Sequence, residues 1–107
     1  MVPTERELHE STEMRAFTSR IYRTMLAGIN EEKKRDWLSW RSRPINEHMR
    51  HASVHMLNVM HHENMERRDS EGGNEFDHAI TRMFFCATIH DSKVKEAMRG
   101  MQEEIAE

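Results

Sequence analysis

The chain has 107 residues, of which 36% are hydrophobic and 33% are charged, with 16 Lys and Arg against 19 Asp and Glu. This length allows one domain, and the formal net charge of −3 argues against a general nucleic-acid coat, which needs a basic surplus to release counterions. The single cysteine, Cys86, excludes an internal disulfide and a cysteine-based zinc site.

The sequence indicates the cellular compartment only in broad terms. The opening residues MVPTERELHE carry too much charge for a secretory signal, and no apolar run approaches the length that spans a bilayer. Together with the lone cysteine, this favours an intracellular protein in a reducing compartment. The sequence does not distinguish the cytoplasm from an organellar matrix.

The first helical segment is predicted over residues 4–41. Thr4 is followed three residues later by Glu7, the pattern of a capping box that begins a helix. Apolar residues then recur at spacings of three and four, as they do on one helix face: Met14, Phe17, Ile21, Met25 and Ile29. Gly28 and Asn30 either end this helix or weaken it, and we favour a bend near residues 28–30.

Basic and aromatic residues cluster at the end of this segment, including Lys33, Trp37, Trp40 and Arg41. Such a patch can contact a lipid surface or phosphate groups, so these four residues mark a candidate membrane-surface contact. Neighbouring acidic residues dilute the charge. Trp37 and Trp40 are three residues apart on one face, and we expect them to bury against another helix.

A second helix is predicted over residues 47–68, after the break at Pro44 and with Asn46 as its N-cap. It carries an apolar stripe, which we expect to face another helix: Met49, Ala52, Met56, Val59 and Met60. Beside this stripe, four histidines fall within an arc of roughly 60° on the helical wheel: His48, His51, His55 and His62.

This histidine stripe is the candidate metal site. Imidazoles one helical turn apart can bind the same ion, and other helices would add His9, Glu10, His78 or His90. Neutral imidazole suits zinc, nickel, copper and iron, while methionine sulfur also suits cuprous copper. The histidines can equally form a polar flank that packs against a partner, a solvated face, or a pH-responsive cluster. We favour the structural or interfacial role, which requires no cofactor.

A third helix is predicted over residues 75–105, after the turn-forming run 69–74. Asn74 is its expected N-cap, and Asp77 is placed like the acidic partner of a capping box. Alternating steps of four and three form a heptad seam: Phe76, Ile80, Met83, Ala87, His90, Val94, Ala97 and Met101. An interruption at Asp91-Ser92 is the alternative to one continuous helix.

Together these elements predict a single all-α domain over residues 1–107. Short connections favour an antiparallel helical hairpin plus a long third helix, similar to a three-helix bundle. No nucleophile-and-base pair can be nominated, since Cys86 next to two phenylalanines reads as a buried inert thiol and Gly72-Gly73 as a linker. We therefore expect no enzyme.

Ten methionines in the chain indicate adaptable docking faces. The leading hypothesis is a non-catalytic interaction protein, an accessory subunit or adaptor. It would dock into a larger protein assembly, or self-associate, through Met-rich helix faces. The alternative is a helical protein that binds zinc, copper, nickel or iron through histidine and methionine.

Two short stretches resemble known families. Ile21-Tyr22-Arg23, followed by Leu26, resembles the Leu-Tyr-Arg tripeptide of a family of small three-helix mitochondrial accessory and assembly proteins, which implies a docking role. The first residue here is Ile, and the family's downstream Phe-Arg element is not found after the turn-forming run 69–74.

Leu8-His9-Glu10, with Glu31-Glu32 and Asp36-Trp37, is similar to the first helix of the encapsulated ferritins. That resemblance implies a ferritin-like di-metal site with Glu31 as a ligand. The family's second helix carries a Glu-x-x-His ligand pair, and no such pair occurs between residues 47 and 68.

Overall fold

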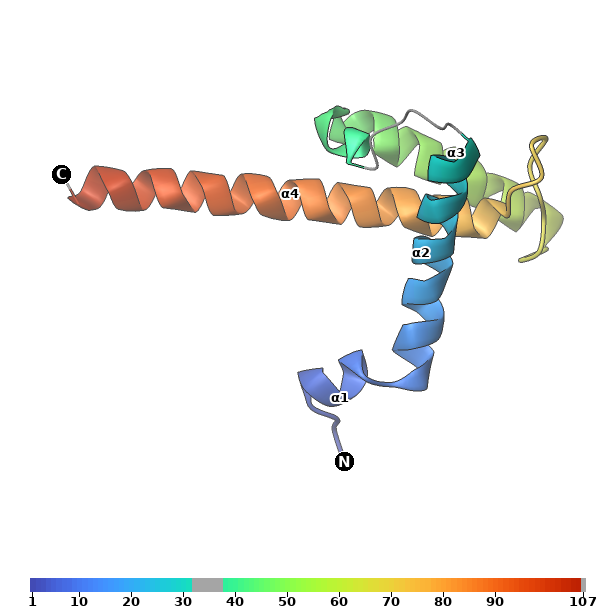
Figure 1. Ribbon diagram of the computed structural model, residues 1–107, viewed down its shortest axis with the longest axis horizontal. Helices are drawn as coiled ribbons and strands as arrows, with labels where there is room; N and C mark the ends of the chain where they lie inside the picture. The colour runs from blue at the N-terminus through green and yellow to red at the C-terminus, as the bar shows by residue number, and fades with distance from the viewer. Residues whose placement is uncertain (32–37, 107) are drawn as a thin grey trace.

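The structure, a computed structural model, describes residues 1–31 and 38–106. Within them the chain forms four α-helices and one 3-10 helix: α1 (Glu5–His9), α2 (Thr12–Glu31), η1 (Ser39–Ser42), α3 (Ile45–His62) and α4 (Glu75–Ala106). Helices α3 and α4 lie side by side as an antiparallel hairpin, and α2 crosses α4 steeply (Figure 1). The all-α fold with three main helices is confirmed, although α2 crosses the hairpin and does not lie antiparallel to it.

The first segment is divided where one helix was predicted. The capping box forms as expected, because the Glu7 N–H donates to Thr4 Oγ1 over 3.1 Å and the Thr4 N–H donates to the Glu7 carboxylate over 3.3 Å. However, Ser11 Oγ accepts the Met14 N–H at 3.2 Å and so begins a new helix. The serine was a visible N-cap signal that the apolar spacing obscured.

Helix α2 is continuous through Gly28 and Asn30 as far as Glu31. After residues 32–37, Ser39–Ser42 form a 3-10 turn in place of the predicted α-helix. Lys33 and Trp37 of the candidate membrane-surface contact lie outside the described residues. No helix in the described part of the chain is both long enough and apolar enough to cross a membrane.

Helix α3 begins and ends earlier than predicted. Pro44, and not Asn46, takes the N-cap position. At the other end Glu63 adopts a φ of 48°, and the N–H groups of Glu63 and Asn64 bond back to the carbonyls of Met60 and Val59. A left-handed backbone costs a residue other than glycine about 1–2 kcal/mol, so the sequence gives no signal for a helix end here.

Helix α4 is one unbroken helix, continuous through Asp91-Ser92. Asn74 is its N-cap as predicted, since its side-chain oxygen accepts the Asp77 N–H at 2.9 Å. The Asp77 carboxylate accepts from Arg20 of α2 at 2.9 Å. Asp77 therefore ties the crossing helix to α4.

The core lies where η1, α3 and α4 meet. Trp40 and Phe85 stack with ring centroids 4.4 Å apart and, with Ile89, form the buried cluster. Met25 of α2 packs against its edge. Trp40 is 8% exposed, which confirms the expected burial against another helix and leaves it unsuited to contact a membrane surface.

Most of the predicted heptad seam of α4 faces solvent. Ile80 is buried, but Met83, Val94 and Met101 are 55%, 42% and 62% exposed. Helix α4 instead buries another face, which includes Ala79 and Phe85. The heptad spacing identified an apolar face, and residues 1–31 and 38–106 leave most of it exposed.

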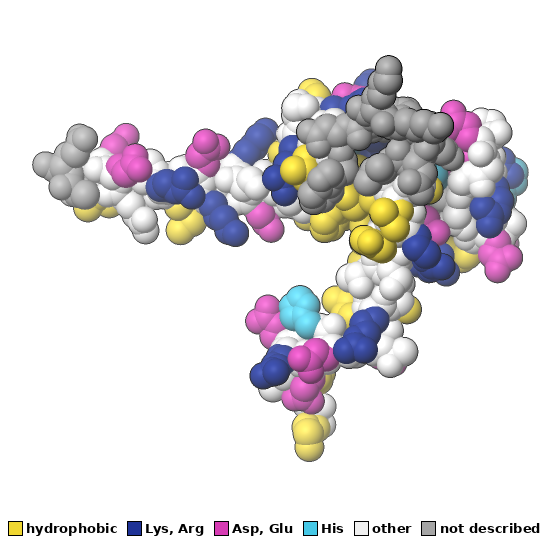
Figure 2. Space-filling model, in the orientation of Figure 1, with side chains coloured by type: hydrophobic (Ala, Val, Ile, Leu, Met, Phe, Trp, Pro, Cys, Tyr) yellow, Lys and Arg dark blue, Asp and Glu magenta, His cyan; other side chains and the backbone are white. Residues whose placement is uncertain are grey.

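The molecule is extended. Its Cα radius of gyration is 17.1 Å, against about 13 Å for a compact domain of this length. The C-terminal half of α4 projects beyond the other elements (Figure 1), and hydrophobic patches lie along its edge (Figure 2). Residues 90–105 are all exposed.

Candidate functional site

His48 is a structural residue at the centre of the fold. It is fully buried, with Nε2 at 2.8 Å from the Trp40 carbonyl oxygen and Nδ1 at 2.9 Å from Arg82 Nη1. Because a guanidinium can only donate, Nδ1 accepts and the Nε2–H donates to the carbonyl. Both ring nitrogens therefore hold η1 and α4 against α3.

His51 and His62 lie nearer to solvent. His51 is half-buried, and burial, followed by the charge of Arg82, lowers its pKa from the ordinary value of 6.5. His62 is exposed at the end of α3, where its ring meets that of His61 edge-on. The stripe thus spreads over four environments along α3.

His55 contacts His78 of α4, and the two rings stack with centroids 5.2 Å apart. His55 Nδ1 is 3.5 Å from Glu75 Oε1, which is too long for a good hydrogen bond and leaves that buried nitrogen without a close partner. His78 Nε2 is 3.7 Å from Asp69 Oδ2. These are long contacts that gain strength if the rings are protonated.

Glu75 anchors the connection between α3 and α4. Its side chain is 4% exposed and accepts from Asn58 Nδ2 at 2.8 Å and from Arg67 Nε at 3.2 Å. A buried carboxylate needs such partners to offset its lost hydration. The polar cluster around His55 therefore joins α3, the connection and α4.

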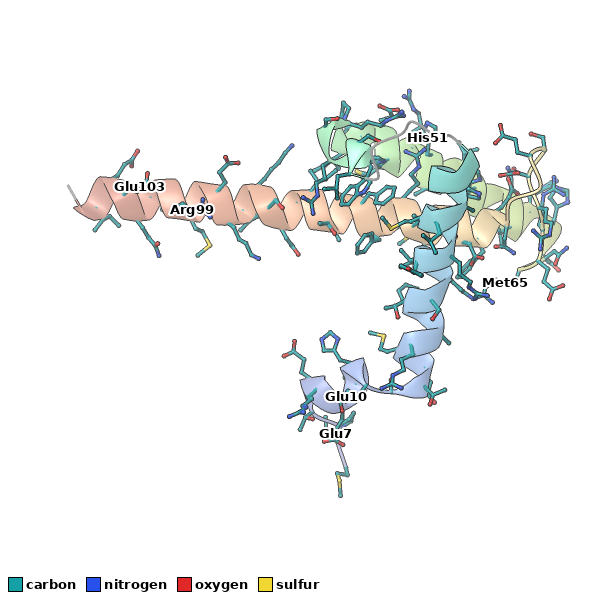
Figure 3. All side chains as sticks on the ribbon, in the orientation of Figure 1. Glu7, Glu10, His51, Met65, Arg99 and Glu103 are labelled. Carbon is teal, nitrogen blue, oxygen red and sulfur yellow. The ribbon has the colours of Figure 1, made fainter. Side chains whose placement is uncertain are left out.

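Among the other proposed metal ligands, His78 reaches the stripe, while Glu10 of α1 lies far from His51 of α3 (Figure 3). His90 lines a separate groove. In residues 1–31 and 38–106, no three His, Cys, Asp or Glu side chains are grouped so that they could hold one ion. The metal site at His48, His51, His55 and His62 stays a prediction.

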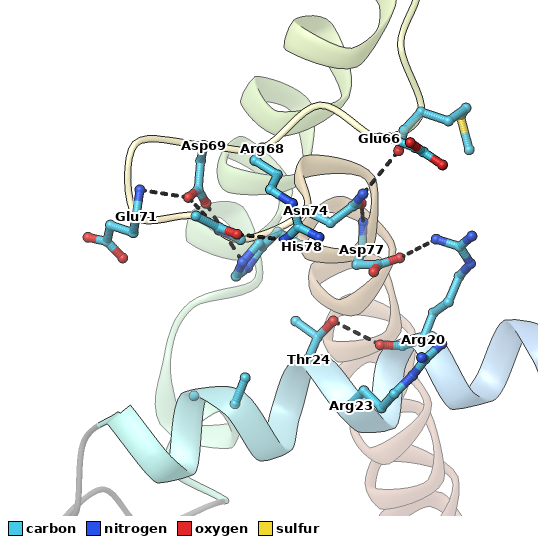
Figure 4. A pocket seen from close by; sticks show the side chains of 15 residues that line it. Arg20, Arg23, Thr24, Glu66, Arg68, Asp69, Glu71, Asn74, Asp77 and His78 are labelled. Atoms are coloured by element: carbon cyan, nitrogen blue, oxygen red, sulfur yellow. Dashed lines mark hydrogen bonds and ion pairs between the residues drawn. The ribbon is translucent and has the colours of Figure 1, made fainter.

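A polar hollow of about 700 Å³ lies between α2 and the α3–α4 connection (Figure 4). Arg20 Nη1 is 2.9 Å from Asp77 Oδ1, and Arg68 Nη1 donates to the Gly72 carbonyl over 2.7 Å. Arg20 and Arg68 therefore bind partners within the chain. We infer that these contacts hold the α3–α4 connection in place beside α2.

Asp69 fixes the turn beside this hollow. Its Oδ1 accepts the N–H groups of Glu71 and Gly73, each at 2.9 Å. Burial alone would raise the pKa of the Asp69 carboxyl. The two backbone amides, with the imidazoles of His78 and His55, lower the pKa by more than burial raises it, so it lies below its ordinary value. The ionised side chain thus stabilises the turn.

An apolar groove of about 860 Å³ runs between α3 and α4. Four of the ten methionines lie along it, and Met49, Met60 and Met83 are 53%, 64% and 55% exposed. The apolar stripe of α3 was expected to pack inward with the histidines at its edge. Instead, the face of α3 that contacts α4 lies between the apolar stripe and the histidine stripe. His48 and Ala52 therefore pack inward, whereas Met49 and Met60 are exposed.

Cys86 lies in the wall of this groove. It is half-buried, burial raises the pKa of its thiol, and Sγ is 3.9 Å from the Ile45 carbonyl oxygen. An uncharged thiol behaves as a small apolar residue, so Cys86 adds to the apolar character of the groove.

Comparison of the chain with protein-family models, with curated proteins and with solved structures gives no match.

Proposed function

We propose that this protein is a non-catalytic interaction protein, an accessory subunit or adaptor, which binds an amphipathic helix of a protein partner in its methionine-rich groove. The supporting observation is the large solvent-accessible surface of the chain. The chain exposes 8933 Å², whereas a folded monomer of its mass exposes about 6,300 Å². The excess, roughly 2,600 Å², is larger than the 800 Å² that one partner contributes to a standard interface.

The chemistry of the groove suits a helix. Its two walls are helices, and three of its four exposed large hydrophobic side chains are unbranched thioethers, which adapt to the shape of an incoming surface. An amphipathic helix places apolar anchors three or four residues apart into such a groove. Because the groove is open along the hairpin, a docked helix would lie parallel to α3 and α4.

A second apolar surface on α2 supports a role in a larger assembly. Met14 and Phe17, three residues apart on one helix face, are 39% and 43% exposed. The same predicted apolar face also carries Ile21, which is buried. A chain with two such surfaces can join two partners.

Methionine methyl NMR tests this proposal. A synthetic amphipathic peptide of leucine and lysine at helical spacing is titrated into protein with labelled methionine methyl groups. We expect the Met49, Met60 and Met83 resonances to shift together, while that of Met65, which is 51% exposed and lies outside the groove, stays unchanged. Met83→Glu should weaken peptide binding by about tenfold or more.

The outcome against the proposal is equally clear. In a monomeric chain, groove resonances that stay unchanged up to about millimolar peptide would rule out a docking groove, since affinity below that level is too weak for assembly. Equal shifts of Met65 and Met83 would show unspecific adsorption to apolar surface.

A further inference from the structure

The uncovered face of α4 has a regular repeat. Its members lie four, three, four, four, three and four residues apart: Met83, Ala87, His90, Val94, Met98, Met101 and Ile105. Two units of 11 residues give about 3.67 residues per turn, close to the α-helix itself, so this stripe runs almost straight along α4. We call these seven residues the α4 stripe.

The α4 stripe continues from the groove into the projecting half of the helix. Met83, Ala87 and His90 line the groove. The later members are uncovered by the described part of the chain, and Val94, Met98 and Ile105 are 42%, 57% and 83% exposed. One apolar surface therefore extends from the hairpin to the end of the helix.

This stripe is complementary to itself. Val94 is its central member, and equal steps to either side reach His90 and Met98, Ala87 and Met101, and Met83 and Ile105. A two-fold axis at Val94 places each member opposite its counterpart on an antiparallel second α4. A symmetric dimer needs the same patch on both subunits to match itself, and here the small Ala87 faces the long Met101.

Charges beside the stripe are compatible with the same pairing. Asp91 and Lys95 border one edge of the stripe, and in the antiparallel arrangement Asp91 of each copy lies near Lys95 of the other. Lys93 and Lys95, each one residue from Val94, also approach their own counterparts. All of these charges are exposed, so each attractive or repulsive pair contributes at most about 1 kcal/mol and the apolar stripe decides the pairing.

We propose that the partner on this face is a second copy of the chain, in a symmetric dimer with antiparallel α4 helices that cross at Val94. The C-terminal half of each α4 then lies along the α4 wall of the other copy's groove. The inference rests on the proposed function, because it names the helix that occupies the groove. The roughly 2,600 Å² of excess surface exceeds what such a dimer requires per copy.

Mass measurement on the full chain tests the dimer. Light scattering at about 100 μM should give twice the monomer mass, and Val94→Glu, which brings two carboxylates together at the axis, should raise the dissociation constant at least about 100-fold. Ser92→Glu adds the same charge on the opposite face of α4 and should leave the dimer intact. Circular dichroism of both variants checks that the exposed substitutions preserve the fold.

Disulfide trapping tests the antiparallel arrangement. In a Cys86→Ser background, chains with Ala87→Cys and chains with Met101→Cys are mixed and oxidised. We expect disulfides between unlike chains, because these positions lie opposite each other and a disulfide needs Cβ atoms about 3.8 Å apart. Disulfides that form mainly between like chains would overturn the antiparallel pairing.

A monomer at about 100 μM, a larger oligomer, or a Val94→Glu variant that still dimerises would overturn the dimer. The proposed function fails separately. If the chain is monomeric and the peptide still shifts the groove methionines, the dimer is wrong and the docking function stands. If the chain is monomeric and the groove resonances stay unchanged, both are wrong.

Discussion

Replacement of His48 is the sharpest test of how the fold is held together. His48→Ala removes a fully buried ring and both of its hydrogen bonds, although the Trp40 carbonyl still accepts the Arg43 N–H at 3.3 Å. Truncation of a buried side chain of this size costs about 2–5 kcal/mol, and the loss of each hydrogen bond costs about 0.5–1.5 kcal/mol. These costs overlap where the site relaxes, so we expect a loss of about 3–5 kcal/mol.

Urea unfolding followed by circular dichroism measures this loss. A domain of this size is stable by about 5–15 kcal/mol, so the variant should keep a small part of its stability and lose about 10 °C or more in Tm. His62→Ala, at the exposed end of the same helix, should change stability by less than about 0.5 kcal/mol.

Two further variants separate the contacts of the ring. A glutamine amide can replace Nε2 and keep the bond to Trp40, while an asparagine oxygen can replace Nδ1 and keep the bond from Arg82. Each should lose less stability than alanine does. If His48→Ala costs no more than His62→Ala, the reasoning that His48 clamps η1 and α4 to α3 is refuted.

Four other results follow from the contacts around the hairpin. Asp77→Asn should lower the free energy of unfolding by less than about 1 kcal/mol, because its partner Arg20 is 43% exposed. The substitution should still speed amide hydrogen exchange in α2, and unchanged exchange would contradict the role of this ion pair in holding α2 to α4. Cys86 should react with a disulfide reagent at pH 8 more slowly than free cysteine, since burial raises its pKa; reaction at the free rate would count against this. The pKa of Asp69 lies below its unfolded value of about 3.9, so its stabilisation is complete above that value and is lost as pH falls through the folded pKa. Asp69→Asn should therefore flatten the acid limb of stability, and an unchanged limb would refute this assignment. If the histidine stripe binds metal, elemental analysis should find stoichiometric metal that disappears in a His51→Ala, His55→Ala variant.

The sequence predicted what depends on neighbouring residues. The caps at Thr4 and Asn74 are contacts across three positions, and the structure contains both. The apolar face of α4 followed from the three- and four-residue spacing of its hydrophobic residues. Ser11, which caps α2, was also a local signal, but the predicted helix over residues 4–41 runs through it.

The sequence could not predict contacts that join distant parts of the chain. His48 meets Trp40 and Arg82, which are 8 and 34 residues away. Spacing alone shows a histidine stripe beside an apolar stripe and cannot say that the contact face falls between them. Nor can it show that Glu63 takes a left-handed backbone, because that cost is met by the packing of the whole hairpin.

The projecting half of α4 makes helix content depend on concentration. Residues 90–105 are all exposed, and an isolated helix of this length is only marginally stable in water. In dilute solution we expect this half to fray, so that its amides exchange quickly while those near Phe85 exchange slowly. As the chain is concentrated and the stripe is covered, the ellipticity per residue should rise, and the length of α4 becomes a readout of association.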